Sequence, residues 1–214
     1  KLGGISSDIA HASKAGKKAD FAITTSKDVK KVVGGVKVGG EFVLPKGLAL
    51  GRADLDAVRL RYNIKQGDTI GVAKTDIDGL DDVIVGLSPK LRDKAELPSL
   101  DKVMPNRRIR SPFVNPAFIK HAEEDIFNQI DSFIMKNAVN TEGKIVNIHI
   151  SNALGVCNKC MVGLMKEAPK SGVVKQFSEL HPKLTIRITA EGGPAVIGKK
   201  GLQTLIVKNG KVIR

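Results

Sequence analysis

The stretch from Asn115 to Ser151, near the middle of the chain, constrains the fold more than any other feature of the sequence. Asn115 can cap a helix that begins there, and Pro116 suits its first turn. Residues 144–151 (KIVNIHIS) then alternate in the manner of a β-strand. A long helix followed by a strand predicts an α/β fold. The helix is predicted by apolar residues that recur three and four positions apart: Phe118, Ile119, Ala122, Ile126, Phe127, Ile130, Phe133 and Ile134.

Shorter patterns on either side of this unit predict further elements. They combine helical or alternating spacing of apolar residues with Asp-Gly and Asn-Gly turns between strands. Their order predicts a layered α/β domain with a mixed sheet of about five strands. The expected elements are a helix at 53–63, a hairpin of strands 69–76 and 82–88, a helix at 157–167, a strand at 184–189 and a final hairpin around Asn209-Gly210.

Two regions have no sustained periodicity. Residues 1–50 are rich in Gly and Lys, so we expect a basic leader segment there and one main domain over residues 51–214. Residues 89–115 contain four prolines and a basic cluster, which predicts a long surface loop. Long loops in compact domains often serve a site, so this one is a candidate for substrate contact. A solvated run of charge explains it equally well.

The charge of the chain favours a polyanionic partner. It has 35 Lys and Arg against 22 Asp and Glu, a formal charge of +13, and such a surplus attracts nucleic acid over long range. A basic protein without such a partner is the alternative, because only one Tyr, seven Phe and no Trp are available to stack on bases. No apolar run approaches the roughly 20 residues of a membrane span, so no membrane partner is expected. The candidate nucleic-acid contacts are Arg107, Arg108, Arg110, Lys199 and Lys200.

The chain has only two cysteines, Cys157 and Cys160, and this excludes a disulfide scaffold. Metal or redox chemistry remains. A catalytic zinc site needs three protein ligands and one open position for water. Two cysteines three apart on a helix can bind one ion, and His121 can supply a third ligand. Each element alone is weak, because a CxxC pair also occurs in redox sites and in structural zinc sites.

Glu123 follows His121 by two residues, close enough to face a water bound to the same metal without ligating it. A carboxylate in that place can take a proton from water and return it to a departing amine. The combination of His-Ala-Glu, a strand and then CxxC is much rarer by chance than any one of its parts.

The run His121-Ala-Glu123, followed by Cys157-Asn-Lys-Cys160, resembles the signature of the cytidine deaminase superfamily. The resemblance implies that His121, Cys157 and Cys160 bind Zn²⁺ and that Glu123 is the general acid and base. It also implies a three-layer α/β/α sandwich in which the last two strands run antiparallel, so that residues 51–214 form a deaminase domain. Val156 departs from the pattern, because most members have a proline before the first cysteine.

A residue other than proline is seen at that position in deaminases of bacterial polymorphic toxins. This chain resembles those deaminases more than it resembles nucleoside enzymes. The resemblance implies the toxin domain of a larger secreted bacterial protein that acts in the cytoplasm of a target cell. Cytosine-to-uracil conversion in DNA, ranked ahead of RNA, is the expected reaction, and a cognate immunity protein is an expected partner. Two alternatives stay open: a deaminase for RNA or for free nucleosides or nucleotides, and a non-enzymatic basic nucleic-acid-binding module with a CxxC redox or structural metal site.

Overall fold

A six-stranded mixed sheet forms the centre of the protein in a computed structural model that describes residues 42–112, 121–152, 156, 163–191 and 204–213. The strand order is β2-β1-β3-β4-β5-β6. The β3 and β4 strands are parallel, and the other neighbouring pairs are antiparallel. The strands are β1 (Ile70–Thr75), β2 (Ile84–Leu87), β3 (Ile145–Ile150), β4 (Thr185–Ala190), β5 (Thr204–Lys208) and β6 (Lys211–Val212).

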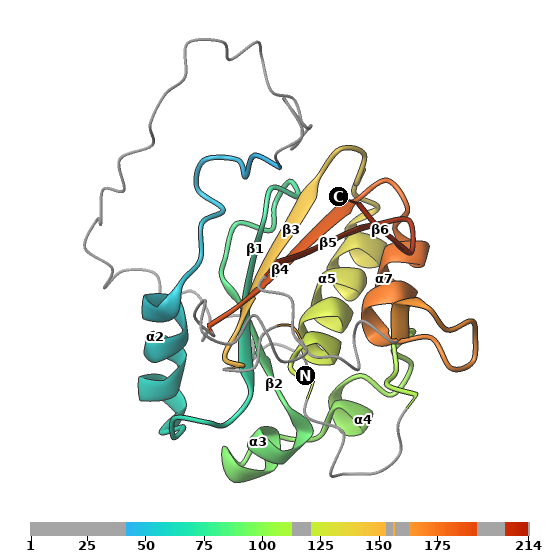
Figure 1. Cartoon of the computed structure of the whole chain (residues 1–214). Coiled ribbons are helices and arrows are strands. Elements are labelled where there is room, and N and C mark those ends of the chain that lie inside the picture. Colours follow the sequence, from blue (N-terminus) through green and yellow to red (C-terminus); the bar gives the residue numbers. More distant parts are fainter. Residues whose placement is uncertain (1–41, 113–120, 153–155, 157–162, 192–203, 214) are drawn as a thin grey trace.

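Helices cover both faces of this sheet. The α5 and α7 helices pack on one face and α2 on the other (Figure 1). This arrangement is an α/β sandwich, as predicted, although the sheet has six strands because the final hairpin adds the short β6. The helices are α2 (Arg52–Tyr62), α3 (Pro89–Lys94), α4 (Leu100–Val103), α5 (Glu123–Asn137) and α7 (Val173–Leu180).

Alternation along β1 shows how one strand serves two cores. Ile70 and Val72 are fully buried in a cluster with Leu55 of α2. Ala73, which points to the opposite face, belongs to a larger cluster with Ile126 of α5. Successive side chains of a strand point to opposite faces, so this single strand carries apolar residues to both layers of helices.

Most predicted elements are present. The helix at 53–63, both strands of the first hairpin, the strands at 144–151 and 184–189 and the final hairpin all match within two residues. Asn209 and Gly210 have positive φ angles of 49° and 70°, as an Asn-Gly hairpin turn requires.

The predicted surface loop at 89–115 is partly wrong. It contains α3 and α4, and it buries Leu91, Leu100 and Ile109 to 5% exposure or less. These isolated apolar residues have no periodicity of their own, because each packs against a different part of the domain.

The long helix starts later than the sequence predicts. Its first residue is Glu123, and Ala122 occupies the N-cap position without a side-chain hydrogen bond. His121 therefore precedes the helix instead of lying in its first turn. Residues 113–120, which include the predicted cap Asn115, lie outside the described residues. The acidic run at 123–125 explains the start, because carboxylates in the first turn interact favourably with the helix dipole.

Two further differences concern the second half of the chain. In the predicted helix at 157–167, the described residues Gly163 and Leu164 are helical, but Lys166 and Glu167 are not. The α7 helix was not predicted, although Val173, Val174 and Phe177 have helical spacing and pack against α5. Phe177 stacks on Phe127 of α5 with ring centroids 4.5 Å apart.

Candidate functional site

Three consecutive acidic residues open α5, and all three are buried. Successive residues of a helix project about 100° apart, so the carboxylates of Glu123, Glu124 and Asp125 point in three directions. Glu124 and Asp125 have basic partners that give them a structural role.

Asp125 points toward β2 and α3. Its Oδ2 accepts hydrogen bonds from the Leu87 amide at 3.1 Å and from Nη1 of Arg92 at 2.7 Å. Gln129, one turn further along the helix, donates to its Oδ1 at 3.0 Å. Burial raises the pKa of Asp125, and the Arg92 guanidinium opposes that effect. The pair fixes the first turn of α5 against the sheet edge.

Glu124 points toward the segment that precedes the helix in sequence. It accepts hydrogen bonds from Nε of Arg107 at 3.0 Å and from the Ser111 amide at 3.1 Å. Nη1 of Arg107 also pairs with Asp101 at 2.7 Å. With two carboxylates and a side chain only 9% exposed, Arg107 holds the segment in place and has little surface for a phosphate. Nucleic-acid contact by Arg107 stays a prediction, and this packing disfavours it.

Arg108 and Arg110 are also engaged within the chain. Arg108 binds both carboxylate oxygens of Asp131, and His181 Nε2 lies 2.8 Å from Oδ1 of the same residue. Arg110 pairs with Asp101 at 3.0 Å. The side chains of Arg108 and Arg110 are 40% and 48% exposed, so both remain accessible, but neither carries uncompensated charge. Lys199 and Lys200 lie outside the described residues.

Glu123 lies beside His121. Nδ1 of the imidazole is 3.7 Å from Oε2 of the carboxylate, and the two residues are 7% and 1% exposed. A buried imidazole next to a buried carboxylate is an arrangement suited to proton transfer. The structure thus brings together two of the four residues predicted for the metal site.

A pair of glycines sets the depth at which these two residues lie. Gly71 of β1 and Gly86 of β2 are paired across the hairpin, and both face the start of α5. A Cβ at Gly86 would overlap the carbonyl oxygen of Ala122, and one at Gly71 would lie 3.1 Å from Cδ1 of Ile126. Because neither glycine has a side chain, the backbone between His121 and Glu123 packs directly on the sheet. No local pattern in the sequence indicates this role.

Cys157 and Cys160 lie outside the described residues, but the chain on either side of them is placed. Val156, immediately before Cys157, and Leu164 are buried in the cluster that contains Ile126. Gly163 packs on Gly172, where an added Cβ would lie 2.7 Å from the Gly172 Cα. The flanks of the CxxC segment and the first turns of α5 therefore share one core.

The donor set fits a zinc ion. An imidazole and two thiolates are ligands that zinc accepts in catalytic sites. The buried carboxylate of Glu123 lies beside the imidazole of His121, where it can take part in proton transfer. His121, Cys157 and Cys160 would hold the ion. Among the residues that the structure describes, no group of three or more His, Cys, Asp or Glu is placed to bind a metal. Because both cysteines fall outside that part, the zinc site stays a prediction.

Comparison with known proteins gives no relative for this chain. No family model matches it, and no curated protein or solved structure does so either. Across the described ranges, no helix has the length and apolar character needed to cross a bilayer.

Proposed function

We propose that this protein is a zinc-dependent hydrolytic deaminase that acts on nucleobases in nucleic acid, with cytosine in DNA as the favoured substrate. One observation supports the proposal above all: His121 and Glu123 are buried side by side at the start of α5, within 3.7 Å of each other. The neighbouring acidic residues Glu124 and Asp125 both have basic structural partners, and Glu123 is the one that faces the histidine.

The strand order adds support. The parallel β3 and β4 strands lie at the centre of the sheet, and the CxxC segment follows the carboxyl end of β3. Ligand sites of open α/β sheets form at the carboxyl ends of strands, where the strand order changes direction. Here the carboxyl ends of the parallel strands β3 and β4 lie side by side, and the proposed site is assigned to that edge of the sheet.

Zinc, when bound, makes a water molecule nucleophilic near neutral pH. The proposed role of Glu123 is to move two protons in turn: it passes one proton of the attacking water to the ring nitrogen, and it then takes the remaining proton of the new hydroxyl group and passes it to the departing amine. Hydrolysis replaces the exocyclic amine of cytosine with a carbonyl oxygen, which gives uracil and ammonia. A base within a duplex must first leave the stack, at a cost of a few kcal/mol.

The net charge of +13 favours nucleic acid over a free nucleoside as the substrate. By resemblance to polymorphic toxins, we also propose that the chain is the toxin domain of a larger secreted bacterial protein, that it acts in the cytoplasm of a target cell and that a cognate immunity protein blocks it. Growth arrest of a bacterial host by the active chain, but not by the Glu123→Gln variant, tests this part.

The proposed reaction is tested with purified chain and oligonucleotides that contain cytosine or adenine, with products identified by mass spectrometry. Active protein converts one of these bases, and Glu123→Ala abolishes conversion while one zinc per chain is retained. Cys157→Ala loses both the metal and the activity. Glu142→Gln, which changes an exposed carboxylate paired with Lys183, is the matched control and retains activity.

Conversion of a free nucleoside without conversion of any oligonucleotide supports the rival nucleoside deaminase. Zinc binding without any deamination, and unchanged by Glu123→Ala, supports the non-enzymatic module. Each result rejects the proposed reaction.

A further inference from the structure

The two faces of the central strands differ sharply in chemistry. On the side of α5, β3, β4 and β5 carry apolar residues that pack in one cluster. On the other side, the same strands carry mostly polar and basic residues. The α2 helix packs against β1 and the Leu48 carbonyl lies on Asn147, which is buried like His149 and Thr185, whereas Lys74, Arg187 and Lys208 remain accessible. We call this second surface the polar sheet face, and it consists of Lys74, Asn147, His149, Thr185, Arg187, Thr189, Thr204, Ile206 and Lys208.

The strand register places three of these residues in one row across the sheet. Lys74 is paired with Asn147, and Asn147 is paired with Arg187. Directly paired residues point to the same face. Nη1 of Arg187 donates to the side-chain oxygen of Asn147 at 3.0 Å, and the Asn147 amide group donates to the Leu48 carbonyl at 2.7 Å. This chain of hydrogen bonds holds the guanidinium against the sheet.

In the described part of the chain, Arg187 and Arg61 are the two arginines that pair with no carboxylate, whereas the other six do. Arg61 lies exposed over the Tyr62 ring. Arg187 is half-buried, and burial lowers its pKa with no acidic group to oppose the effect. A desolvated guanidinium with no described counter-ion is a feature of anion sites.

His149 adjoins Arg187 on this face. The hydroxyl of Thr189 donates to the Ile148 carbonyl at 3.2 Å, so it accepts from Nδ1–H of His149 at 2.8 Å. This fixes the imidazole with Nε2 as the nitrogen that carries no structural hydrogen bond. Burial lowers the pKa of His149, Glu191 and Asp54 raise it, and Arg187 lowers it. The ring therefore reports on any anion that comes close to Arg187.

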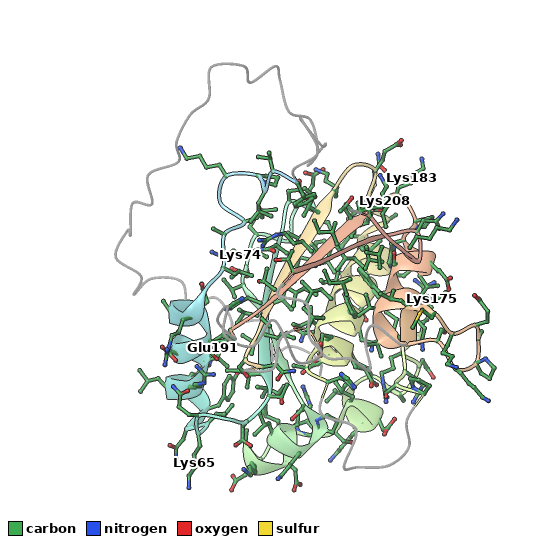
Figure 2. All side chains as sticks on the ribbon, viewed as in Figure 1. Lys65, Lys74, Lys175, Lys183, Glu191 and Lys208 are labelled. Atoms are coloured by element: carbon green, nitrogen blue, oxygen red, sulfur yellow. The ribbon has the colours of Figure 1, made fainter. Side chains whose placement is uncertain are left out.

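Two lysines extend the positive charge on either side of Arg187. Lys74 lies two strands away, about 10 Å at the usual strand spacing, and the exposed Lys208 is a diagonal neighbour at about 7–8 Å. Figure 2 shows Lys74 on β1, Lys208 at the end of β5 and Glu191 apart from both, beside α2. Glu191 is neutralised there by Arg59, whose Nη2 lies 2.8 Å from its carboxylate. Cations about 7–10 Å apart can each contact a different phosphate of one nucleic-acid strand.

We propose that the polar sheet face binds the phosphate backbone of nucleic acid through Arg187, Lys74 and Lys208. This inference rests on the nucleic-acid part of the proposed function and moves the contact surface away from the paired cluster at residues 107–110. The surface lies on the face of the sheet opposite to His121 and Glu123, so it anchors the polymer without taking part in the reaction.

The test measures binding of the whole chain to a fluorescent oligonucleotide across a range of salt concentrations. Arg187→Gln should weaken binding about five- to tenfold at 0.1 M salt and reduce the slope of log K against log salt by about 1, as expected for one lost phosphate contact. Arg61→Gln removes the same charge from α2 and should change neither quantity. Arg187→Lys should restore most of the affinity.

Two further measurements make the outcome independent of folding of the arginine variant. The Lys74→Gln/Lys208→Gln pair changes positions outside the core and should reduce the salt slope by about 2. In the unaltered chain, the ring signals of His149 should shift in NMR spectra when the oligonucleotide is added. Equal affinity of Arg187→Gln and Arg61→Gln, an unchanged slope in the lysine pair or a static His149 signal would overturn the proposal.

Binding and deamination fail separately in this design. A chain that binds as predicted but converts no base refutes the proposed reaction and leaves the surface assignment intact. If the unaltered chain deaminates normally and the Arg187→Gln variant binds the oligonucleotide as tightly as the unaltered chain, only the surface assignment is refuted. If inorganic phosphate displaces the oligonucleotide at the same phosphate concentration at which the oligonucleotide itself saturates the protein, the surface is a free-phosphate site. That result also rejects the polymer surface.

Discussion

Gly86 lies directly beneath the carbonyl group of Ala122, the residue between His121 and Glu123. The position leaves no space for a methyl group, because the contact is with backbone and not with the end of a flexible side chain. The backbone between the two proposed functional residues is therefore seated on β2 by the absence of a side chain.

Gly86→Ala should push the start of α5 away from the sheet. We expect a loss of about 3 kcal/mol in the free energy of unfolding, at the upper end of the range for overpacked sites. Chemical denaturation measures the loss. Gly71→Ala is the graded control, because its Cβ would meet the movable end of Ile126 at 3.1 Å, and it should cost less. Equal stability of the two variants would show that α5 does not pack on Gly86 as closely as this contact indicates.

The buried pair of Arg92 and Asp125 should be strongly coupled. Arg92→Met leaves a buried carboxylate without its cation, so we expect a loss of about 3–5 kcal/mol in stability. Combining it with Asp125→Asn should cost less than the sum of the single changes, because both charges are then removed. A double-mutant cycle in urea measures this coupling, and strict additivity would argue against the pair.

Asp131 should make the fold sensitive to acid. Burial raises its pKa, but hydrogen bonds from His181 and Arg108 outweigh burial and hold the pKa at about 2, below the ordinary 3.8. The unfolded chain therefore binds this proton more readily than the folded chain. The carboxylate stabilises the fold above about pH 4, and its contribution of about 2 kcal/mol disappears as the pH falls toward 2.

Asp131→Asn should consequently lower stability at pH 7 and flatten the dependence on pH between 4 and 2. Thermal unfolding across that range measures both effects. Asp78→Asn, which alters an exposed carboxylate paired with Lys144, is the control and should leave the profile unchanged. A variant with the same acid profile as the unaltered protein would remove the assigned role of Asp131.

Zinc binding should depend on His121 and on both cysteines. His121→Ala is expected to lower the zinc content well below one ion per chain, because two thiolates alone form an incomplete site. His149→Ala, a buried histidine on the opposite face of the sheet, is the matched control and should keep the metal. Elemental analysis of purified variants decides between them, and equal zinc content would place the ion elsewhere.

The sequence predicts those elements of the fold that depend on residues close together in the chain. Alternation in Ile145–Ile150 and the Asn209-Gly210 turn each specify their structure within a few residues. The roles of Arg107 and Arg108 could not be found in this way. Their carboxylate partners, Glu124 and Asp131, lie 17 and 23 residues further along the chain and meet them only when the segment packs against α5.

The same reasoning applies to the candidate site. The spacing of His121 and Glu123 indicates that they can act together, and the structure places them 3.7 Å apart. Nothing in the local sequence marks Gly86 as their support, because the clash that excludes a side chain there arises only from the packing of α5 on the β1-β2 hairpin. Arg187 is similar, since its row of neighbours comes from strands β1, β3 and β4.

The most direct test of the proposed chemistry compares the unaltered chain with Glu123→Gln, both loaded with zinc and incubated with an oligonucleotide that contains cytosine. The account predicts that the unaltered chain converts cytosine to uracil and that Glu123→Gln, with the same zinc content and the same fold, does not. Uracil formation at equal rates by both proteins, or by neither, would contradict it.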